Sequence, residues 1–145
     1  MSDAVIVESV RSPGARRRGG LASTRADEFG IQVLKGLMAR VPQVKPEEID
    51  DLIVGCSFPE CETGMNLGRI LAMGAGLPIS VAGMTVNRFC ASGLQAIADA
   101  TAKIRAGWSE IIIAGGCETM THIPMGGSAM RPHPDWKFGS MPDVY

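Results

Sequence analysis

The 145-residue sequence lacks a charge excess, a long apolar run and any basic segment leading into one. Its 14 Lys and Arg residues nearly balance 15 Asp and Glu residues, for a formal net charge of −1. The charge therefore gives no support for binding to nucleic acid or to an anionic membrane surface. No stretch approaches about 18 consecutive apolar residues, which argues against a membrane span and a secretion signal. We expect a cytoplasmic protein.

The sequence also lacks the spacings typical of cysteine frameworks. Its four cysteines, none in a C-x-x-C pair, are Cys56, Cys61, Cys90 and Cys117. With 46% hydrophobic residues, the chain can build a core without disulfides, and we expect reduced thiols. A zinc site would have to join Cys56 and Cys61 to His122 or His133. The ligand spacing of known zinc sites is absent, as are the P-loop and Rossmann motifs, so we predict no bound metal or cofactor.

Apolar periodicity predicts strands that alternate with helices. Strands are expected at residues 4–10, 51–56 and 110–114, and in a short segment before Cys90; helices are expected after caps at Ser23 or Thr24 and at Asn66, and from residue 91. A single turn is expected at residues 46–49. Strands separated by helices predict the α/β class, with a largely parallel sheet covered on both faces.

The stretch at residues 83–107 carries the strongest chemical signal. Leu94, Ile97 and Thr101 fall on one face of a predicted buried helix that Gly107 ends. Cys90 then lies where a strand gives way to this helix, facing its positive dipole end, which favours a nucleophilic thiolate. The backbone N–H of Cys90 or its neighbours would be placed to stabilise an oxyanion. The alternative is that Cys90 is a small buried apolar residue.

Several motifs match one enzyme family. Residues 86–96, V-N-R-F-C-A-S-G-L-Q-A, closely resemble the acyl-enzyme signature of the thiolases. Further stretches resemble thiolase motifs in the family's order: residues 11–13 with 19–20, 66–69, 75–78 and 111–121. Residues 118–127 look more like degradative 3-ketoacyl-CoA thiolases than acetyl-CoA acetyltransferases that form acetoacetyl-CoA. Ketoacyl synthases share the fold and a cysteine at the same junction, but the sequence around Cys90 fits thiolases better.

The resemblance implies a thiolase-like fold that is incomplete in this chain. The family's subunit is a duplicated αβαβα fold with mixed, mostly parallel sheets. Residues 1–122 would form the N-terminal α/β half without its last strand, and residues 123–145 would begin the inserted loop domain. We expect exposed apolar surface and hence association, because an entire facing half would be absent. The family is commonly a homo-oligomer, and residues 84–88 are our candidate interface strand.

The resemblance assigns one catalytic residue. Cys90 would be the nucleophile of an acyltransferase that cleaves 3-ketoacyl-CoA with coenzyme A, or runs the reverse Claisen condensation, with coenzyme A as substrate. The activating histidine and the second cysteine belong to motifs outside this chain, and neither His122 nor His133 lies in them. Cys117 occupies a variable position, and Glu118 is expected to orient a loop. We therefore expect the chain alone to be inactive.

Other interpretations stay open at this point. The alternatives are a fragment, one subunit of a split thiolase whose partner chain supplies the missing half, and a non-catalytic relative that binds acyl-CoA. A basic loop at residues 11–20, with three consecutive arginines, suits either a phosphate of coenzyme A or a solvated surface or subunit contact.

Overall fold

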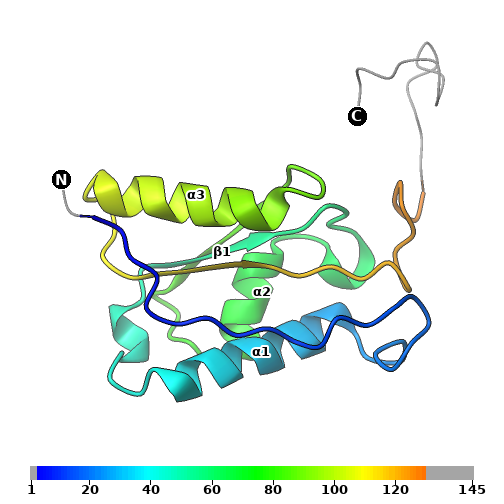
Figure 1. Ribbon diagram of the computed structural model, residues 1–145, viewed down its shortest axis with the longest axis horizontal. Helices are drawn as coiled ribbons and strands as arrows, with labels where there is room; N and C mark the ends of the chain where they lie inside the picture. The colour runs from blue at the N-terminus through cyan, green and yellow to red at the C-terminus, as the bar shows by residue number, and fades with distance from the viewer. Residues whose placement is uncertain (1–2, 130–145) are drawn as a thin grey trace, which may run out of the picture.

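The computed structural model describes residues 3–129, and a three-stranded parallel sheet lies at its centre (Figure 1). The strands are β1 (Asp51–Gly55), β2 (Ala82–Val86) and β3 (Ile112–Gly116), in the order β2-β1-β3. Strand β1 is parallel to both neighbours, and at its end Gly55 lies opposite Val86 on one side and Gly116 on the other. The predicted α/β class and parallel sheet are confirmed.

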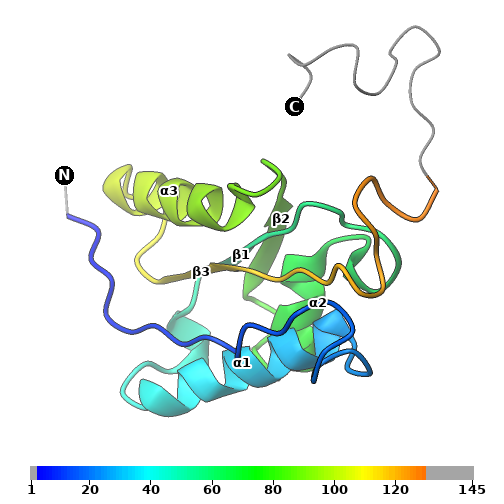
Figure 2. The ribbon, with the colours of Figure 1, turned by 45° about the vertical axis from the view of Figure 1, so that its right-hand side comes forward.

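Helices cover both faces of this sheet, as predicted. Figures 1 and 2 show α3 (Ser92–Arg105) on one face, with α1 (Ala26–Arg40) and α2 (Leu67–Gly74) on the other. Strand β1 is buried along its whole length, and its side chains alternate between two cores. Leu52 and Val54 pack with α1 and α2, whereas Ile53 packs with small residues of α3. Two 3-10 turns, η1 (Pro46–Glu48) and η2 (Cys61–Thr63), complete the described elements.

The two helices on the α1 side begin in different ways. Asn66 caps α2 as predicted, because its side chain accepts the N–H of Arg69 at 3.2 Å. The predicted Ser23 or Thr24 cap of α1 is wrong: Arg25 holds that position without a side-chain cap. The N–H of Ala26 donates instead to Glu62 Oε1 at 2.8 Å, so a residue distant in the sequence replaces the local cap.

The predicted strand at residues 4–10 is also wrong. The segment has no regular secondary structure, and Val5, Ile6 and Val7 are 75%, 78% and 77% exposed. Strand β1 already pairs on both sides, so this apolar run has no place beside it. Strand propensity reports how well a side chain suits a half-buried sheet, and it does not supply the partner strand.

Helix α3 turns a different face to the core from the predicted one. Ser92, Ala96 and Ala100 are buried, whereas Leu94 and Ile97 of the predicted face are 71% and 39% exposed. Small residues face the sheet because the helix approaches it closely: Gly93 and Gly116 nearly touch, and no side chain separates them. An ion pair between Lys103 and buried Asp51, at 2.5 Å, holds the other end of the helix.

The remaining expectations have mixed outcomes. Strand β3 begins at Ile112, includes both glycines and is only half-buried, in contrast to the buried strand predicted at residues 110–114. Strand β2 lies at an edge of the described sheet, and its predicted role in an interface stays a prediction.

The domain boundary near residue 122 also stays a prediction, because residues 130–145 lie outside the described part. Within residues 3–129, no helix is long and apolar enough to cross a membrane.

The approach of α3 to β1 predicts a sharp effect at Gly55. A Cβ placed there would lie 2.3 Å from the Ser92 carbonyl carbon and 2.5 Å from the Gly93 nitrogen. Backbone atoms cannot rotate away, so Gly55→Ala should lower the free energy of unfolding by about 1–3 kcal/mol in urea denaturation. Gly36→Ala is the control, because Gly36 lies in α1 with open space around it, and there alanine should stabilise by about 0.5–1 kcal/mol. Equal effects of the two changes would contradict this packing.

Candidate active site

Cys90 lies in the turn between β2 and α3, as predicted. Its side chain is exposed, and its thiol is free of any disulfide, so the alternative of a buried apolar cysteine is wrong. The preceding residue, Phe89, has a φ of 48°, which places a non-glycine residue in the left-handed region. Such backbone costs on the order of 1 kcal/mol and persists only where surrounding contacts hold it.

Two polar side chains hold this turn. The Ser92 hydroxyl accepts the Arg88 N–H at 2.8 Å and donates to the Phe89 carbonyl at 2.6 Å. Asn87 accepts the Phe89 N–H at 2.9 Å and donates to the Ser57 carbonyl, also at 2.9 Å. The turn that carries Cys90 is therefore fixed at both ends and tied to the loop after β1.

The backbone N–H groups after Cys90 are partly committed. The Ala91 N–H donates to the Arg88 carbonyl at 3.1 Å, and the Ser92 N–H donates to the Phe89 carbonyl at 3.0 Å. Neither is directed at the Cys90 sulfur or at a substrate oxygen. An oxyanion donor drawn from the neighbours of Cys90 therefore stays a prediction, and these two groups do not provide it.

Glu118 joins the loops that follow β1 and β3. Its carboxylate accepts the Ser57 N–H at 2.6 Å and faces the Cys56 sulfur at 3.6 Å. Burial, together with this carboxylate, raises the pKa of the Cys56 thiol to about 11. These contacts match the expected loop-orienting role of Glu118, because they connect two segments that flank the turn of Cys90.

Cys117 is buried on the α1 side of the sheet. Its thiol donates to the Ala26 carbonyl at 3.3 Å, and burial raises its pKa to about 12. A thiol held protonated in this way is a poor nucleophile. Of the four cysteines, Cys90 and Cys61 are exposed, and of these two Cys90 lines the cleft described next.

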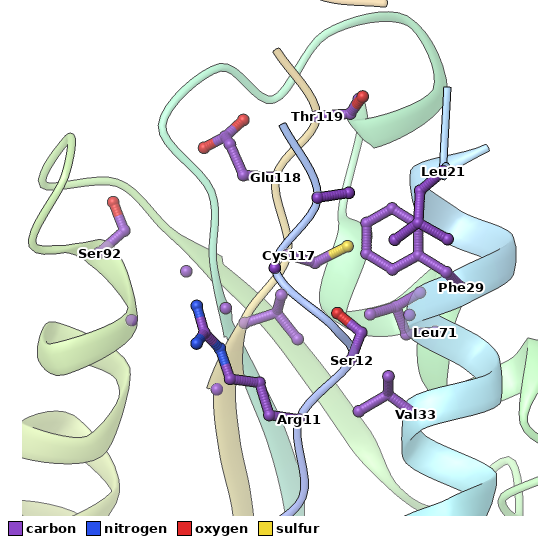
Figure 3. Close-up of a pocket in the computed structure, with 18 of the residues that line it drawn as sticks. Arg11, Ser12, Leu21, Phe29, Val33, Leu71, Ser92, Cys117, Glu118 and Thr119 are labelled. Carbon is purple, nitrogen blue, oxygen red and sulfur yellow. The ribbon is translucent and has the colours of Figure 1, made fainter. Parts of the chain in front are cut away.

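A cleft of about 790 Å³ brings these segments together. Residues 10–17 form one wall, strand β3 and its following loop form another, and the turn at Phe89 and Cys90 lies at the α3 side. Figure 3 shows Phe29, Val33 and Leu71 projecting from α1 and α2 on one side, and Ser92 at the start of α3 on the other. The cleft therefore combines an apolar side with an exposed thiol.

His122 does not join Cys90. His122 does not line the cleft; its Nδ1 lies 2.8 Å from Glu62 Oε1, and its Nε2 lies 2.8 Å from the Ala22 carbonyl oxygen. His133 lies outside the described residues. The hydrogen bond that the ring donates to Glu62, helped by the one to the Ala22 carbonyl, raises the pKa of His122, since only the imidazolium donates at both nitrogens. In residues 3–129, no group of three or more possible metal ligands is present.

Comparison with known proteins shows which family the chain belongs to. The family described as "Thiolase, N-terminal domain" matches residues 4–143. The chain belongs to the thiolase family. The 3-ketoacyl-CoA thiolases of Idiomarina loihiensis and Bacillus subtilis are each 45% identical to it, over 86% and 92% of this chain but only 33% and 34% of their own length. A β-ketoadipyl-CoA thiolase of Acinetobacter baylyi is 45% identical over 86% of this chain and 31% of its own. The chain spans about a third of the length of these curated thiolases.

Sequence reasoning missed the residues that hold the turn in place. It treated Ser92 and Asn87 only as part of a motif, yet their side chains make four of the hydrogen bonds around Cys90. The available signal was chemical: serine and asparagine next to a helix start commonly bond nearby backbone groups. The basic loop at residues 11–20 was visible in the sequence, but the place of Arg11 at the cleft was not, because it depends on where the N-terminal segment lies.

The burial of the cysteines predicts an order of chemical modification. With iodoacetamide at about pH 7.5, Cys61 and Cys90 should be alkylated in the folded protein, and peptide mass spectrometry should find Cys56 and Cys117 unmodified. In urea all four should react. Early labelling of Cys117 in the folded state would contradict its placement beneath α1.

The contacts of His122 predict a dependence of stability on pH. Because its pKa is raised in the folded state, its contribution is fully present below the ordinary histidine pKa and is lost as pH rises through the raised value. Urea denaturation should show the largest advantage of wild type over His122→Gln at about pH 5.5, shrinking towards about pH 9. Glu62→Gln should remove most of this pH dependence. An advantage that stays constant across the range would show that His122 is not charged in the fold.

Proposed function

We propose that this chain supplies the nucleophile-bearing part of a thiolase, in which Cys90 carries the acyl group as a thioester. The observation that supports this most strongly is the placement of Cys90. It is exposed in a constrained turn at the start of α3, beside an apolar cleft, while the other cleft cysteine, Cys117, is buried. The names of the relatives suggest 3-ketoacyl-CoA or β-ketoadipyl-CoA as the substrate class.

The proposed reaction uses the sulfur twice. The Cys90 thiolate attacks the 3-keto carbon, and the bond between C2 and C3 of the substrate then breaks. Its electron pair leaves as the enolate of acetyl-CoA, which takes a proton, and the shortened acyl group stays on sulfur. The thiol of a second coenzyme A then displaces Cys90 and carries away the acyl group. The same steps in reverse form a carbon–carbon bond.

The acid and base for these steps are expected from residues outside the described part. His122 is committed to Glu62 and Ala22, away from the cleft, and Cys117 is a buried, protonated thiol. We therefore propose that a further thiolase half, in the same polypeptide or in a partner chain, completes the site. The exposed apolar side chains of α3, Leu94 and Ile97, offer a surface that such a half would cover.

A non-catalytic relative that binds acyl-CoA is the second candidate. The exposed thiol of Cys90 favours a catalytic role over a binding role, since a protein that only binds acyl-CoA requires the cleft but no nucleophile. Transfer of an acyl group to Cys90 separates the two candidates.

Intact mass before and after incubation with acetoacetyl-CoA tests the proposal. With the further thiolase half present, the wild-type chain should gain one acetyl group, and Cys90→Ser should gain none, because a serine hydroxyl is a far weaker nucleophile than a thiolate. Cys61→Ser is the matched control: it removes the other exposed cysteine and should leave the mass gain unchanged. Acetylation that persists in Cys90→Ser would overturn the assignment. A wild-type chain that stays unmodified would show that the nucleophile is not preformed here.

A further inference from the structure

The cleft beside Cys90 is basic on the side formed by the N-terminal segment. Three arginines line it, Arg11, Arg16 and Arg17, whereas Glu118 is its one acidic lining residue. The Glu118 carboxylate is already engaged by the Ser57 N–H and the Cys56 thiol. Three arginines and one carboxylate leave the lining with an excess of two positive charges.

The three guanidinium groups also lack partners elsewhere in the described chain. None of the ion pairs within residues 3–129 includes Arg11, Arg16 or Arg17, and no carboxylate there lies within 4.0 Å of their guanidinium groups. No side-chain hydrogen bond engages these guanidinium groups either, over the same residues. Arginine forks without partners at a cleft are suited to planar or tetrahedral oxyanions, which they bind in a bidentate manner.

Arg11 is an exposed arginine whose side chain reaches over the sheet. Figure 3 shows its side chain extending from the N-terminal segment across the strands, towards the side where Ser92 begins α3. The apolar side chains of α1 and α2 lie on the opposite side of the same cleft. A ligand there meets an apolar surface, a thiol and a cation within one cavity of about 790 Å³.

We propose that Arg11, assisted by Arg16 and Arg17, forms an anion subsite that binds a carboxylate or phosphate group of the thioester substrate. This inference deepens the proposed function, on which the choice of ligand rests. The anion has two possible sources with the same chemistry: a carboxylate at the far end of the acyl chain, or a phosphate of coenzyme A. With the carboxylate source, the subsite would favour acyl chains that end in a second acid group.

A pair of maleimides tests the subsite without requiring catalysis. The Cys90 sulfur bonds to one carbon of the maleimide double bond, and the other carbon of that double bond takes a proton, so no further reactant is needed. The ratio of labelling rates for 6-maleimidohexanoate over its neutral carboxamide should be high at Cys90 in the wild type. It should fall at least about fivefold in Arg11→Gln, since a charge-assisted hydrogen bond is lost.

Matched controls exclude a general charge effect. Arg18→Gln removes the same charge from the same loop, but Arg18 does not line the cleft, and this variant should keep the wild-type ratio. Cys61 reports the ratio at an exposed thiol outside the cleft, and it should not respond to Arg11→Gln. A ratio at Cys90 that is unchanged in both Arg11→Gln and the double variant Arg16→Gln with Arg17→Gln would overturn the subsite.

Thioester donors identify the source of the anion. Succinyl and butyryl thioesters of coenzyme A and of N-acetylcysteamine differ separately in the terminal carboxylate and in the phosphates. A preference for succinyl over butyryl that Arg11→Gln removes in both series would identify the acyl carboxylate. A loss confined to coenzyme A thioesters would identify a phosphate. If no donor acylates Cys90, the proposed function fails in this chain, and the maleimide ratio still decides the subsite.

Discussion

The close approach of α3 to strand β1 is the constraint on which the rest of the structure depends. At Gly55 the backbone of the strand faces the backbone of the helix with no side chain between them. The start of α3 is therefore fixed relative to the ends of β1 and β3. The turn before α3 is fixed as well, because it leads directly into the helix, and Cys90 is held at the end of the sheet. A Cβ at this point would move the helix and the nucleophile together.

The same constraint explains which side chains face the core. Serine and alanine, and no leucine, line the inner face of α3, because a larger residue would hold the helix away from the glycines of β1 and β3. The larger side chains are left on the outer face. The packing that places Cys90 therefore also leaves apolar side chains, Leu94 and Ile97, on the outer face of α3.

Local signals in the sequence predicted most of the elements. The strand at residues 51–55, the Asn66 cap and the junction at Cys90 each follow from short-range patterns, and all three are confirmed. The errors share one physical cause: they concern partners that are distant in the sequence. The run at residues 4–10 has strand-forming side chains but no partner strand, and Glu62 replaces the expected serine or threonine cap of α1. The inner face of α3 was mispredicted because apolar periodicity ranks Leu94 above Ala96, whereas the glycines opposite favour the smaller residue.

The topology of the sheet also bears on how the chain is made. Strand β1 ends at residue 55, but its partner β3 ends at residue 116, so the central strand cannot complete its hydrogen bonding until residue 116 has left the ribosome. Until then the backbone groups on the β3 side of β1 are unpaired, and pairing across so long a loop is slow. During synthesis, β1 therefore has an unpaired edge that is open to wrong pairing, although the strand is buried along its whole length in the finished fold.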